Sequence, residues 1–141
     1  MGTPIDQLIK NRKEKLAKII KLGFNPSPPF YKKEQQIKNV KKIGLKANIA
    51  GRIIAYRRHG KLCFLDLKDE TGKIQALTTA NDLGEKTYAM IKLLDVGDFI
   101  GVQGEVFKTQ AGEITIKAKA ATFLQKGLHP LPDTWYGLKD T

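Results

Sequence analysis

The stretch FLDLKDETGKIQ, residues 64–75, has the pattern of two short β-strands joined by a tight turn. Apolar and polar residues alternate before the turn, and such alternation is typical of a strand with one buried face. Cys63, Leu65 and Leu67 are therefore expected to face a core. Phe64 then points to the opposite side of the strand, so a large aromatic ring is predicted on the solvent-facing surface.

The turn at 69–72 determines how the two strands pair. With this turn as a four-residue loop, Phe64 lies opposite Leu77, and Gln75 becomes its diagonal neighbour on the same outer face. A ring that stacks on a base and an amide that bonds to the base edge are typical of single-strand recognition. The alternative is that Phe64 packs under an N-terminal helix or under the turn expected at 57–61.

The residues on both sides of this hairpin predict a small β-barrel. Strands are expected at 45–56, 62–68, 73–78, 98–108 and 113–124, and a helix is expected at 81–94. Gly51 is a candidate for a bulge or bend where the first strand curls around the barrel. Three strands, a helix and two further strands follow the order of an OB-fold. We therefore predict a mainly β protein with a five-stranded, partly open barrel, a fold that commonly binds oligonucleotides.

The charge of the chain favours a polyanionic partner. The 141 residues carry a formal net charge of +11 and a sequence pI of about 9.8, and such proteins most often bind nucleic acid. Residues 1–46 hold twelve Lys and Arg against three Asp and Glu, whereas the rest is nearly neutral. A lysine surface that only aids solubility is the alternative. Because the positive charge is concentrated in one third of the chain, we favour RNA or DNA as the partner over a surface that only aids solubility. A nucleic-acid partner in turn favours a binding role for Phe64.

An amphipathic helix is predicted at 5–22. Thr3 suits the N-cap, Pro4 suits the first helical position, and Gly23 suits the end of the helix. Six apolar residues follow helical spacing: Ile5, Leu8, Ile9, Leu16, Ile19 and Ile20. The opposite face carries four lysines that we expect to attract RNA phosphates: Lys10, Lys13, Lys18 and Lys21.

Several other classes of protein are disfavoured. No apolar run approaches the roughly 18 residues of a membrane span, and the lysine-rich start does not match a signal peptide, so we expect a soluble protein. A single cysteine, Cys63, fits a reducing cytoplasm. Cys63, His59 and His129 lack ligand spacing, so no metal site is expected. A proline-rich linker is predicted at 24–31, followed by a weaker helical pattern at 37–43.

Three stretches carry a family resemblance: RKEKLAKIIKLGFNP (12–26), YRRHGKLCFLDLKDETGKIQ (56–75) and GDFIGVQGEVFKTQAGEITIKAKAATFLQKGLHPLPDTWYGLKD (97–140). Together they resemble the N-terminal domain of class II lysyl-tRNA synthetases, and the resemblance runs over most of the chain. It implies a basic helix with a proline-rich linker at 1–44, an anticodon-binding OB domain at 45–126 and a connector at 127–141.

The resemblance implies roles for four residues. Phe64 matches a phenylalanine that stacks on the central anticodon uridine, and Gln75 matches a glutamine that hydrogen-bonds to that base. Arg57 matches an arginine that helps to hold the same nucleotide, and Glu113 matches a glutamate that reads a flanking uridine. By residue type alone, Arg57 is equally well explained as a solvated hairpin charge, and Glu113 is better explained as a plain turn residue.

The resemblance also implies a partner and a parent enzyme. The partner is the anticodon stem-loop of tRNA(Lys), and the parent is a homodimeric lysine–tRNA ligase that uses ATP and Mg²⁺. The chain ends at Thr141, where the catalytic domain of the family begins, so we expect a monomeric fragment without catalytic residues, cofactors or activity of its own. Two alternatives stay open: a stand-alone tRNA- or single-strand-binding protein, and an anticodon reader of the aspartyl or asparaginyl type.

Overall fold

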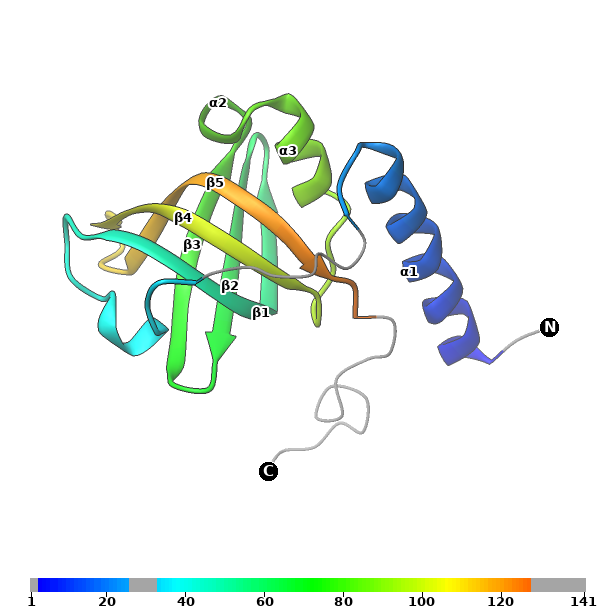
Figure 1. Ribbon diagram of the computed structural model, residues 1–141, viewed down its shortest axis with the longest axis horizontal. Helices are drawn as coiled ribbons and strands as arrows, with labels where there is room; N and C mark the ends of the chain where they lie inside the picture. Colours follow the sequence, from blue (N-terminus) through cyan, green and yellow to red (C-terminus); the bar gives the residue numbers. More distant parts are fainter. Residues whose placement is uncertain (1–2, 26–32, 128–141) are drawn as a thin grey trace.

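A helix stands beside a small β-barrel in the computed structural model, which describes residues 3–25 and 33–127 (Figure 1). The helix is α1 (Pro4–Lys21). The barrel strands are β1 (Lys46–His59), β2 (Leu62–Asp69), β3 (Gly72–Thr79), β4 (Phe99–Lys108) and β5 (Ile114–Gln125). The linker predicted at 24–31 and the connector predicted at 127–141 lie mostly outside the described residues.

The five strands close into a barrel in the order β1-β2-β3-β5-β4. Neighbouring strands are antiparallel except β3 and β5, which pair in parallel. Between β3 and β4 the chain forms α2 (Ala80–Leu83) and α3 (Glu85–Ile91), which confirms the predicted OB-fold order (Figure 1). The single helix predicted at 81–94 is wrong in detail, because Gly84 at φ +87° separates two short helices.

β1 is longer than predicted and serves two partners. Up to Arg52 it pairs with β4, and beyond that residue it pairs with β2. Of the bulge or bend predicted at Gly51, the bulge is wrong, because the irregularity in pairing falls between Ile53 and Ala55, whereas the bend stays a prediction. Gly51 instead marks a close approach of β1 to β2, since a Cβ there would lie 3.0 Å from the backbone oxygen of Lys68. The position therefore needs a glycine for space rather than for a bulge.

The turn predicted at 57–61 is present but shorter than predicted. β1 continues to His59, and a two-residue connection that begins with Gly60 leads into β2. Gly60 has φ +60°, a conformation that glycine adopts without steric cost. Arg57 consequently lies in a barrel strand rather than in a turn, and it pairs with Phe64 of β2.

The β2–β3 hairpin has the predicted register. Phe64 lies opposite Leu77, and the strands join through a tight turn after Asp69. The Asp69 carboxylate accepts hydrogen bonds from two backbone N–H groups of this turn, at 2.7 and 3.1 Å. It also accepts one at 2.9 Å from Ile37, the first residue of the 3-10 helix η1 (Ile37–Asn39). Asp69 therefore closes the turn and ties it to the segment before β1.

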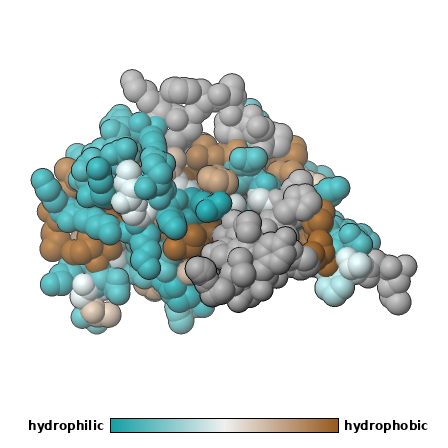
Figure 2. All heavy atoms as spheres, turned by 90° about the horizontal axis from the view of Figure 1, so that it is seen from below, coloured by the Kyte–Doolittle hydropathy of each residue, from teal (hydrophilic) through white to brown (hydrophobic). Residues whose placement is uncertain are grey.

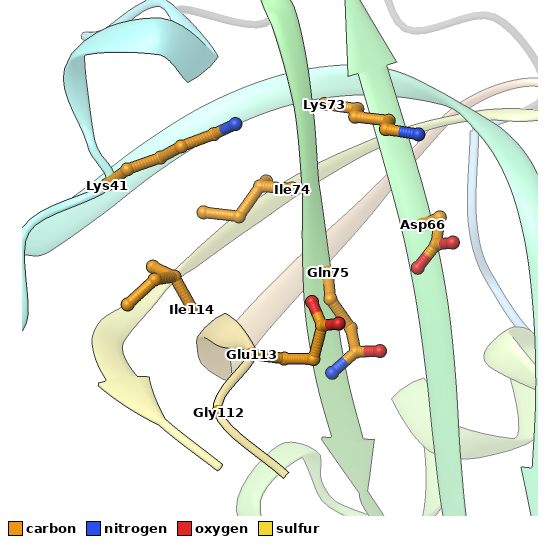
Figure 3. Close-up of a pocket in the computed structure, with 8 residues that line it drawn as sticks. All are labelled: Lys41, Asp66, Lys73, Ile74, Gln75, Gly112, Glu113 and Ile114. Carbon is orange, nitrogen blue, oxygen red and sulfur yellow. The ribbon is translucent and has the colours of Figure 1, made fainter.

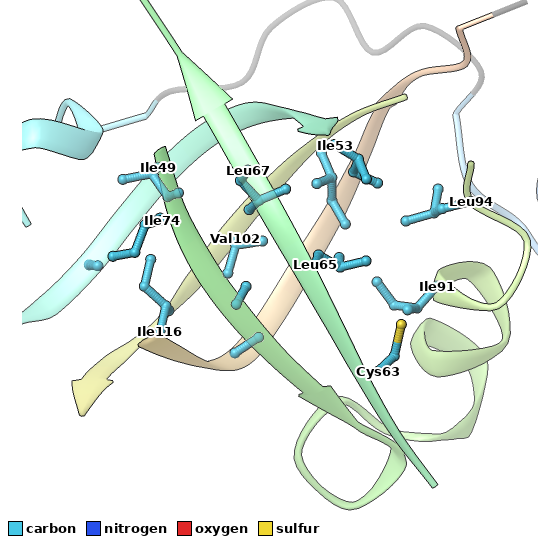
Figure 4. Close-up of a cluster of buried hydrophobic side chains, with 14 of the residues drawn as sticks. Ile49, Ile53, Cys63, Leu65, Leu67, Ile74, Ile91, Leu94, Val102 and Ile116 are labelled. Atoms are coloured by element: carbon cyan, nitrogen blue, oxygen red, sulfur yellow. The ribbon is translucent and has the colours of Figure 1, made fainter. Parts of the chain in front are cut away.

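Aliphatic side chains fill the interior of the barrel (Figure 4). Those that are at most 5% exposed include Ile49, Ile53, Leu65, Leu67, Ile74, Val102 and Ile116. Ile37 and Val40 are buried as well, although the helical pattern predicted at 37–43 forms only the short η1. Phe64 does not belong to this buried cluster.

The ends of α1 match the sequence expectation. The Thr3 hydroxyl accepts a hydrogen bond from the Asp6 N–H, the Asp6 carboxylate accepts one from the Thr3 N–H, and Gly23 at φ +104° follows the helix. Ile19 is fully buried, but Ile20 is 43% exposed and does not share the apolar face as predicted. The outer lysines are all exposed: Lys10, Lys13, Lys18 and Lys21. No helix among the described residues is long and apolar enough to cross a membrane.

An ion network, buried at Lys126 and Asp98 and partly exposed at Lys15, joins α1 to the residue that follows β5. The Lys126 ammonium lies 2.6 Å from a carboxylate oxygen of Asp98 and 2.9 Å from one of Asp95. Asp95 also contacts Lys15 of α1 at 2.8 Å. These four residues, Lys15, Asp95, Asp98 and Lys126, are called the rear network below. Because its members come from α1, the segment before β4 and the end of β5, it holds the helix against the barrel.

Candidate nucleic-acid interface

Phe64 projects from the outer side of β2, as the alternation predicts. Its neighbours Cys63 and Leu65 are 0% exposed in the core, whereas Phe64 is half-buried. The His59 ring, at the end of β1, meets it edge-on with 6.4 Å between ring centroids. Phe64 therefore packs against the end of β1 at the margin of the barrel and keeps part of its surface accessible.

Arg57, Asp66 and Gln75 form a hydrogen-bonded row across β1, β2 and β3. The Nη2 atom of Arg57 donates to Asp66 at 3.0 Å and to the side-chain oxygen of Gln75 at 2.9 Å. The hydrogen-bonded carboxylate of Asp66 raises the pKa of Arg57 above its already high ordinary value. The guanidinium is therefore charged at physiological pH, and it stays within reach of solvent with 42% of its side chain exposed.

The row continues into β5. The side-chain nitrogen of Gln75 donates to the Thr115 hydroxyl at 2.9 Å, and this hydroxyl donates to the backbone oxygen of Glu113 at 3.2 Å. The same oxygen accepts the Thr109 N–H at 2.9 Å, which closes the β4–β5 turn. Thr115 is 0% exposed, so it supports the row from beneath. Arg57, Asp66, Gln75 and Thr115 are called the front network below.

An open groove of about 470 Å³ lies beside the front network (Figure 3). Its lining residues are Lys41, Asp66, Lys73, Ile74, Gln75, Gly112, Glu113 and Ile114. Figure 3 shows the Gln75 amide beside the Glu113 carboxylate, with the ammonium groups of Lys41 and Lys73 further along. Pockets of roughly 300–1,000 Å³ hold small-molecule ligands. The groove therefore has room for a nucleobase and offers it donors, acceptors and positive charge.

The structure brings four predicted site residues together and leaves four others elsewhere. Arg57 pairs with Phe64 and bonds to Gln75, and Gln75 lines the groove with Glu113. The four lysines of α1 lie at the other end of β5, where the rear network attaches the helix (Figure 1). β5 has 12 residues, which at about 3.3 Å each corresponds to roughly 40 Å of strand.

Two members of the front network, Asp66 and Thr115, are not among the site residues predicted from the sequence. Asp66 had a usable signal, because it lies two residues after Phe64 and the alternation places both on one face. Thr115 had no local signal. Its contact with Gln75 depends on the parallel pairing of β3 with β5, across a sequence separation of 40 residues.

The rest of the described surface does not offer a competing apolar interface. Seen from below, it is mostly hydrophilic, and hydrophobic side chains show in separate patches (Figure 2). The exposed large hydrophobic residues come from four separate segments: Ile20, Ile43, Leu62 and Phe99. Within residues 3–25 and 33–127, no group of three or more His, Cys, Asp or Glu is placed to hold a metal ion. The groove, by contrast, is lined mainly by polar and charged side chains.

A closed five-stranded barrel with a polar groove over its β2–β3 face defines an oligonucleotide-binding protein of the OB class. The comparison with protein families gives the same result. The chain belongs to the tRNA anti-codon family of OB-fold nucleic acid binding domains, whose family model matches residues 47–124.

Curated relatives of similar sequence are named lysine–tRNA ligase, which confirms the resemblance found from the motifs. The relative from Syntrophomonas wolfei is 43% identical over 141 residues, covering 96% of this chain and 29% of the relative. The one from Carboxydothermus hydrogenoformans is 40% identical with the same coverage. The one from Pediococcus pentosaceus is 50% identical over 97 residues, covering 69% of this chain and 20% of that protein. The chain thus spans less than a third of the length of these relatives.

Proposed function

We propose that this chain is the anticodon-recognition domain of a lysine–tRNA ligase and that it binds the anticodon stem-loop of tRNA(Lys). One observation carries the proposal: Arg57, Phe64, Gln75 and Glu113 come from four different strands or turns, yet they are neighbours in the fold. Arg57 pairs with Phe64 and bonds to Gln75, and Gln75 lines the groove together with Glu113. Membership of the OB-fold nucleic acid binding family and the names of the relatives support the same function.

The central anticodon base stacks on Phe64 and presents its edge to Gln75. Stacking on an aromatic ring combined with hydrogen bonds to the base edge is the usual way in which proteins recognise unstacked RNA bases. Arg57 adds a fixed positive charge beside this base, suited to a phosphate or a base oxygen. Glu113, which lines the groove together with Gln75, accepts the N3–H of a flanking uridine.

The lysines of α1 act on a different part of the RNA. They lie at the far end of the barrel from the groove, so a stem-loop whose anticodon sits on Phe64 reaches them with its phosphates and not with its anticodon bases (Figure 1). Such contacts strengthen binding without reading sequence.

The chemistry of aminoacylation belongs to the rest of the parent enzyme. The proposal assigns ATP and Mg²⁺ binding and dimerisation to a catalytic domain that this chain does not include, and it assigns the parent to the cytoplasm. We therefore expect these 141 residues alone to form no lysyl-adenylate from ATP and lysine. Pyrophosphate exchange measured with the purified chain tests this expectation, and detectable exchange contradicts it.

The binding proposal is tested with anticodon stem-loops that differ only at the central base. The Gln75→Ala variant is expected to lose preference for central uracil more than total affinity, because it removes an edge contact and keeps the stack on Phe64. Gln103→Ala is a matched control, since Gln103 is exposed on β4 outside this groove. Wild-type binding that ignores the anticodon sequence contradicts the proposal.

Competition among purified tRNAs identifies which anticodon is read. The proposal expects tRNA(Lys) to displace tRNA(Asp) and tRNA(Asn) from the wild-type chain. If either of the latter binds more tightly, the chain is an anticodon reader of the aspartyl or asparaginyl type.

A further inference from the structure

We infer that Thr115 is a positioning residue that fixes the orientation of the Gln75 side-chain amide and thereby enables the groove to distinguish uracil from cytosine. This inference rests on the proposed function and adds a residue that touches no ligand itself. Thr115 is 0% exposed, and it acts through a 2.9 Å hydrogen bond to Gln75.

One end of the Gln75 amide faces a group that can only donate. Its oxygen accepts a hydrogen bond from Nη2 of Arg57 at 2.9 Å. A guanidinium has five N–H donors and no acceptor. Asp66 holds this guanidinium in place through a second bond from the same nitrogen, at 3.0 Å. The amide NH₂ cannot occupy this position without placing donor against donor.

The other end of the amide faces a group whose single proton is already used. The Thr115 hydroxyl donates that proton to the backbone oxygen of Glu113 at 3.2 Å, so it offers Gln75 only lone pairs. The Gln75 nitrogen donates to it at 2.9 Å. Rotating the amide by 180° breaks both bonds at once. Arg57 and Thr115 thus permit one orientation of Gln75 and exclude the other.

A fixed amide presents a fixed order of donor and acceptor to the RNA. After its two internal bonds, Gln75 keeps one free N–H and one free oxygen lone pair. Uracil has a donor at N3 beside the acceptor O4, whereas cytosine has an acceptor at N3 beside a donor amino group at C4. A freely rotating amide can satisfy either base by turning over. When the base is held against Phe64, an amide in a fixed orientation forms both hydrogen bonds with only one of the two bases. It opposes the other base with donor against donor and acceptor against acceptor.

Thr115 also links Gln75 to the turn that carries Glu113. Its hydroxyl bonds to the backbone of Glu113, whose carboxylate lines the same groove as Gln75. The turn that carries Glu113 is therefore anchored to the amide that reads the neighbouring base.

The test compares Thr115→Val, which removes the hydroxyl at similar shape, with Thr115→Ser, which keeps it. For each variant, affinity is measured for two stem-loops that carry U or C at the central anticodon position. Loss of the hydrogen bond between Gln75 and Thr115 corresponds to about a 2- to 12-fold change in the ratio of the affinities for the U and C stem-loops. We expect the U-over-C preference of Thr115→Val to fall by this factor, and Thr115→Ser to keep the wild-type preference.

Thr78→Val is the control for a structural effect. Thr78 is likewise 0% exposed, and its hydroxyl donates at 2.8 Å to the backbone oxygen of Cys63, away from the groove. The Thr78→Val variant should lower the melting temperature about as much as Thr115→Val does, but it should leave the U-over-C preference unchanged. In the chain without RNA, NMR of the Gln75 side-chain NH₂ should show faster rotation in Thr115→Val than in Thr115→Ser.

The outcomes separate this inference from the proposed function. If the wild-type chain prefers U and Thr115→Val keeps that preference in full, the inference is wrong and the anticodon-binding proposal stands. The inference also fails if Thr78→Val reduces the preference as strongly, because the effect is then general. If the wild-type chain does not distinguish the stem-loops at all, the proposed function fails and takes the inference with it.

Discussion

The front and rear networks each contain a cation paired with a carboxylate, but these ion pairs differ in burial. In the rear network, Lys126 is 1% exposed and Asp98 is 0% exposed, and their charged atoms lie 2.6 Å apart. In the front network, the ion pair of Arg57 with Asp66 has side chains that are 42% and 31% exposed, at 3.0 Å. Both networks join segments that are distant in sequence: the front network joins β3 to β5, and the rear network joins α1 to the segments before β4 and after β5.

This difference in burial assigns the two networks to different tasks. A buried ion pair is strongly destabilising to break, because the remaining charge has no partner and no water. A solvent-exposed ion pair contributes about 0–1 kcal/mol to stability, and its groups remain accessible to a ligand. The rear network therefore maintains the fold, and the front network is available for recognition.

The largest effect is expected from Lys126→Met. This change leaves the Asp98 carboxylate buried without its cation, so the free energy of unfolding should fall by about 3–5 kcal/mol. Denaturation with urea measures the loss. Lys119→Met is the control, because Lys119 is 54% exposed in its pair with Asp82 and should cost about 0–1 kcal/mol. Equal losses in the two variants would remove the distinction between buried and exposed networks.

A smaller effect, on binding instead of stability, is expected from Phe64→Ala. Loss of base stacking should weaken binding of the anticodon stem-loop by about 1–3 kcal/mol, or roughly 5- to 150-fold. The melting temperature should change little, because the ring lies outside the core. Phe123→Ala is the contrasting variant, since Phe123 is 2% exposed and its loss should cost about 3–5 kcal/mol of stability. If Phe64→Ala melts as low as Phe123→Ala, the ring is structural.

Acid should weaken the hairpin that carries the front network. Burial favours the neutral form of Asp69, but hydrogen bonds from Thr71, Ile37 and Gly72 outweigh it and lower the pKa of Asp69 below its ordinary value of 3.8. The carboxylate thus stabilises the fold above pH 3.8, and this contribution disappears as the pH falls through the lowered pKa. Unfolding free energies of wild type and Asp69→Asn should therefore converge below pH 4. If the difference in unfolding free energy between wild type and Asp69→Asn stays constant below pH 4, the ionised Asp69 carboxylate does not stabilise the fold in this way.

The smallest effect is expected from single lysines of α1. Each Lys→Gln change at 10, 13, 18 or 21 that removes a phosphate contact should reduce the slope of log affinity against log salt. The reduction should be about 0.7 for single-stranded RNA, or nearer 0.9 for duplex. Cognate and non-cognate tRNAs should lose affinity alike. Substitution keeps α1 in place, whereas deletion would also remove the buried Ile19. Unchanged slopes in all four variants would make these lysines a solubility surface.

Part of the candidate site could be predicted because its determinants are local. The alternation of Cys63, Phe64 and Leu65 places the ring outside, and the short turn after Asp69 pairs Phe64 with Leu77. Period-two patterning and turn length depend on residues that are close in sequence. The neighbouring turn was predicted at 57–61, longer than it is, because charged residues such as Arg57 resemble a loop whenever their partner, here Asp66, comes from another strand.

The sequence by itself determined the strand order of an OB-fold, the basic N-terminal helix with its caps, and the outward position of Phe64. Each of these follows from periodicity, capping residues or composition. Only the tertiary structure decided that Thr115 lies beneath Gln75, that Arg57 and Asp66 complete the row, and that the α1 lysines lie far from the groove. The physical reason is that these contacts depend on which strands pair and on where α1 packs. β1 pairs with β2 beside Arg57 and Asp66, β5 meets β3 in parallel beside Gln75, and the rear network holds α1. The residues next to these positions in sequence do not indicate which strand or helix will lie beside them in the fold.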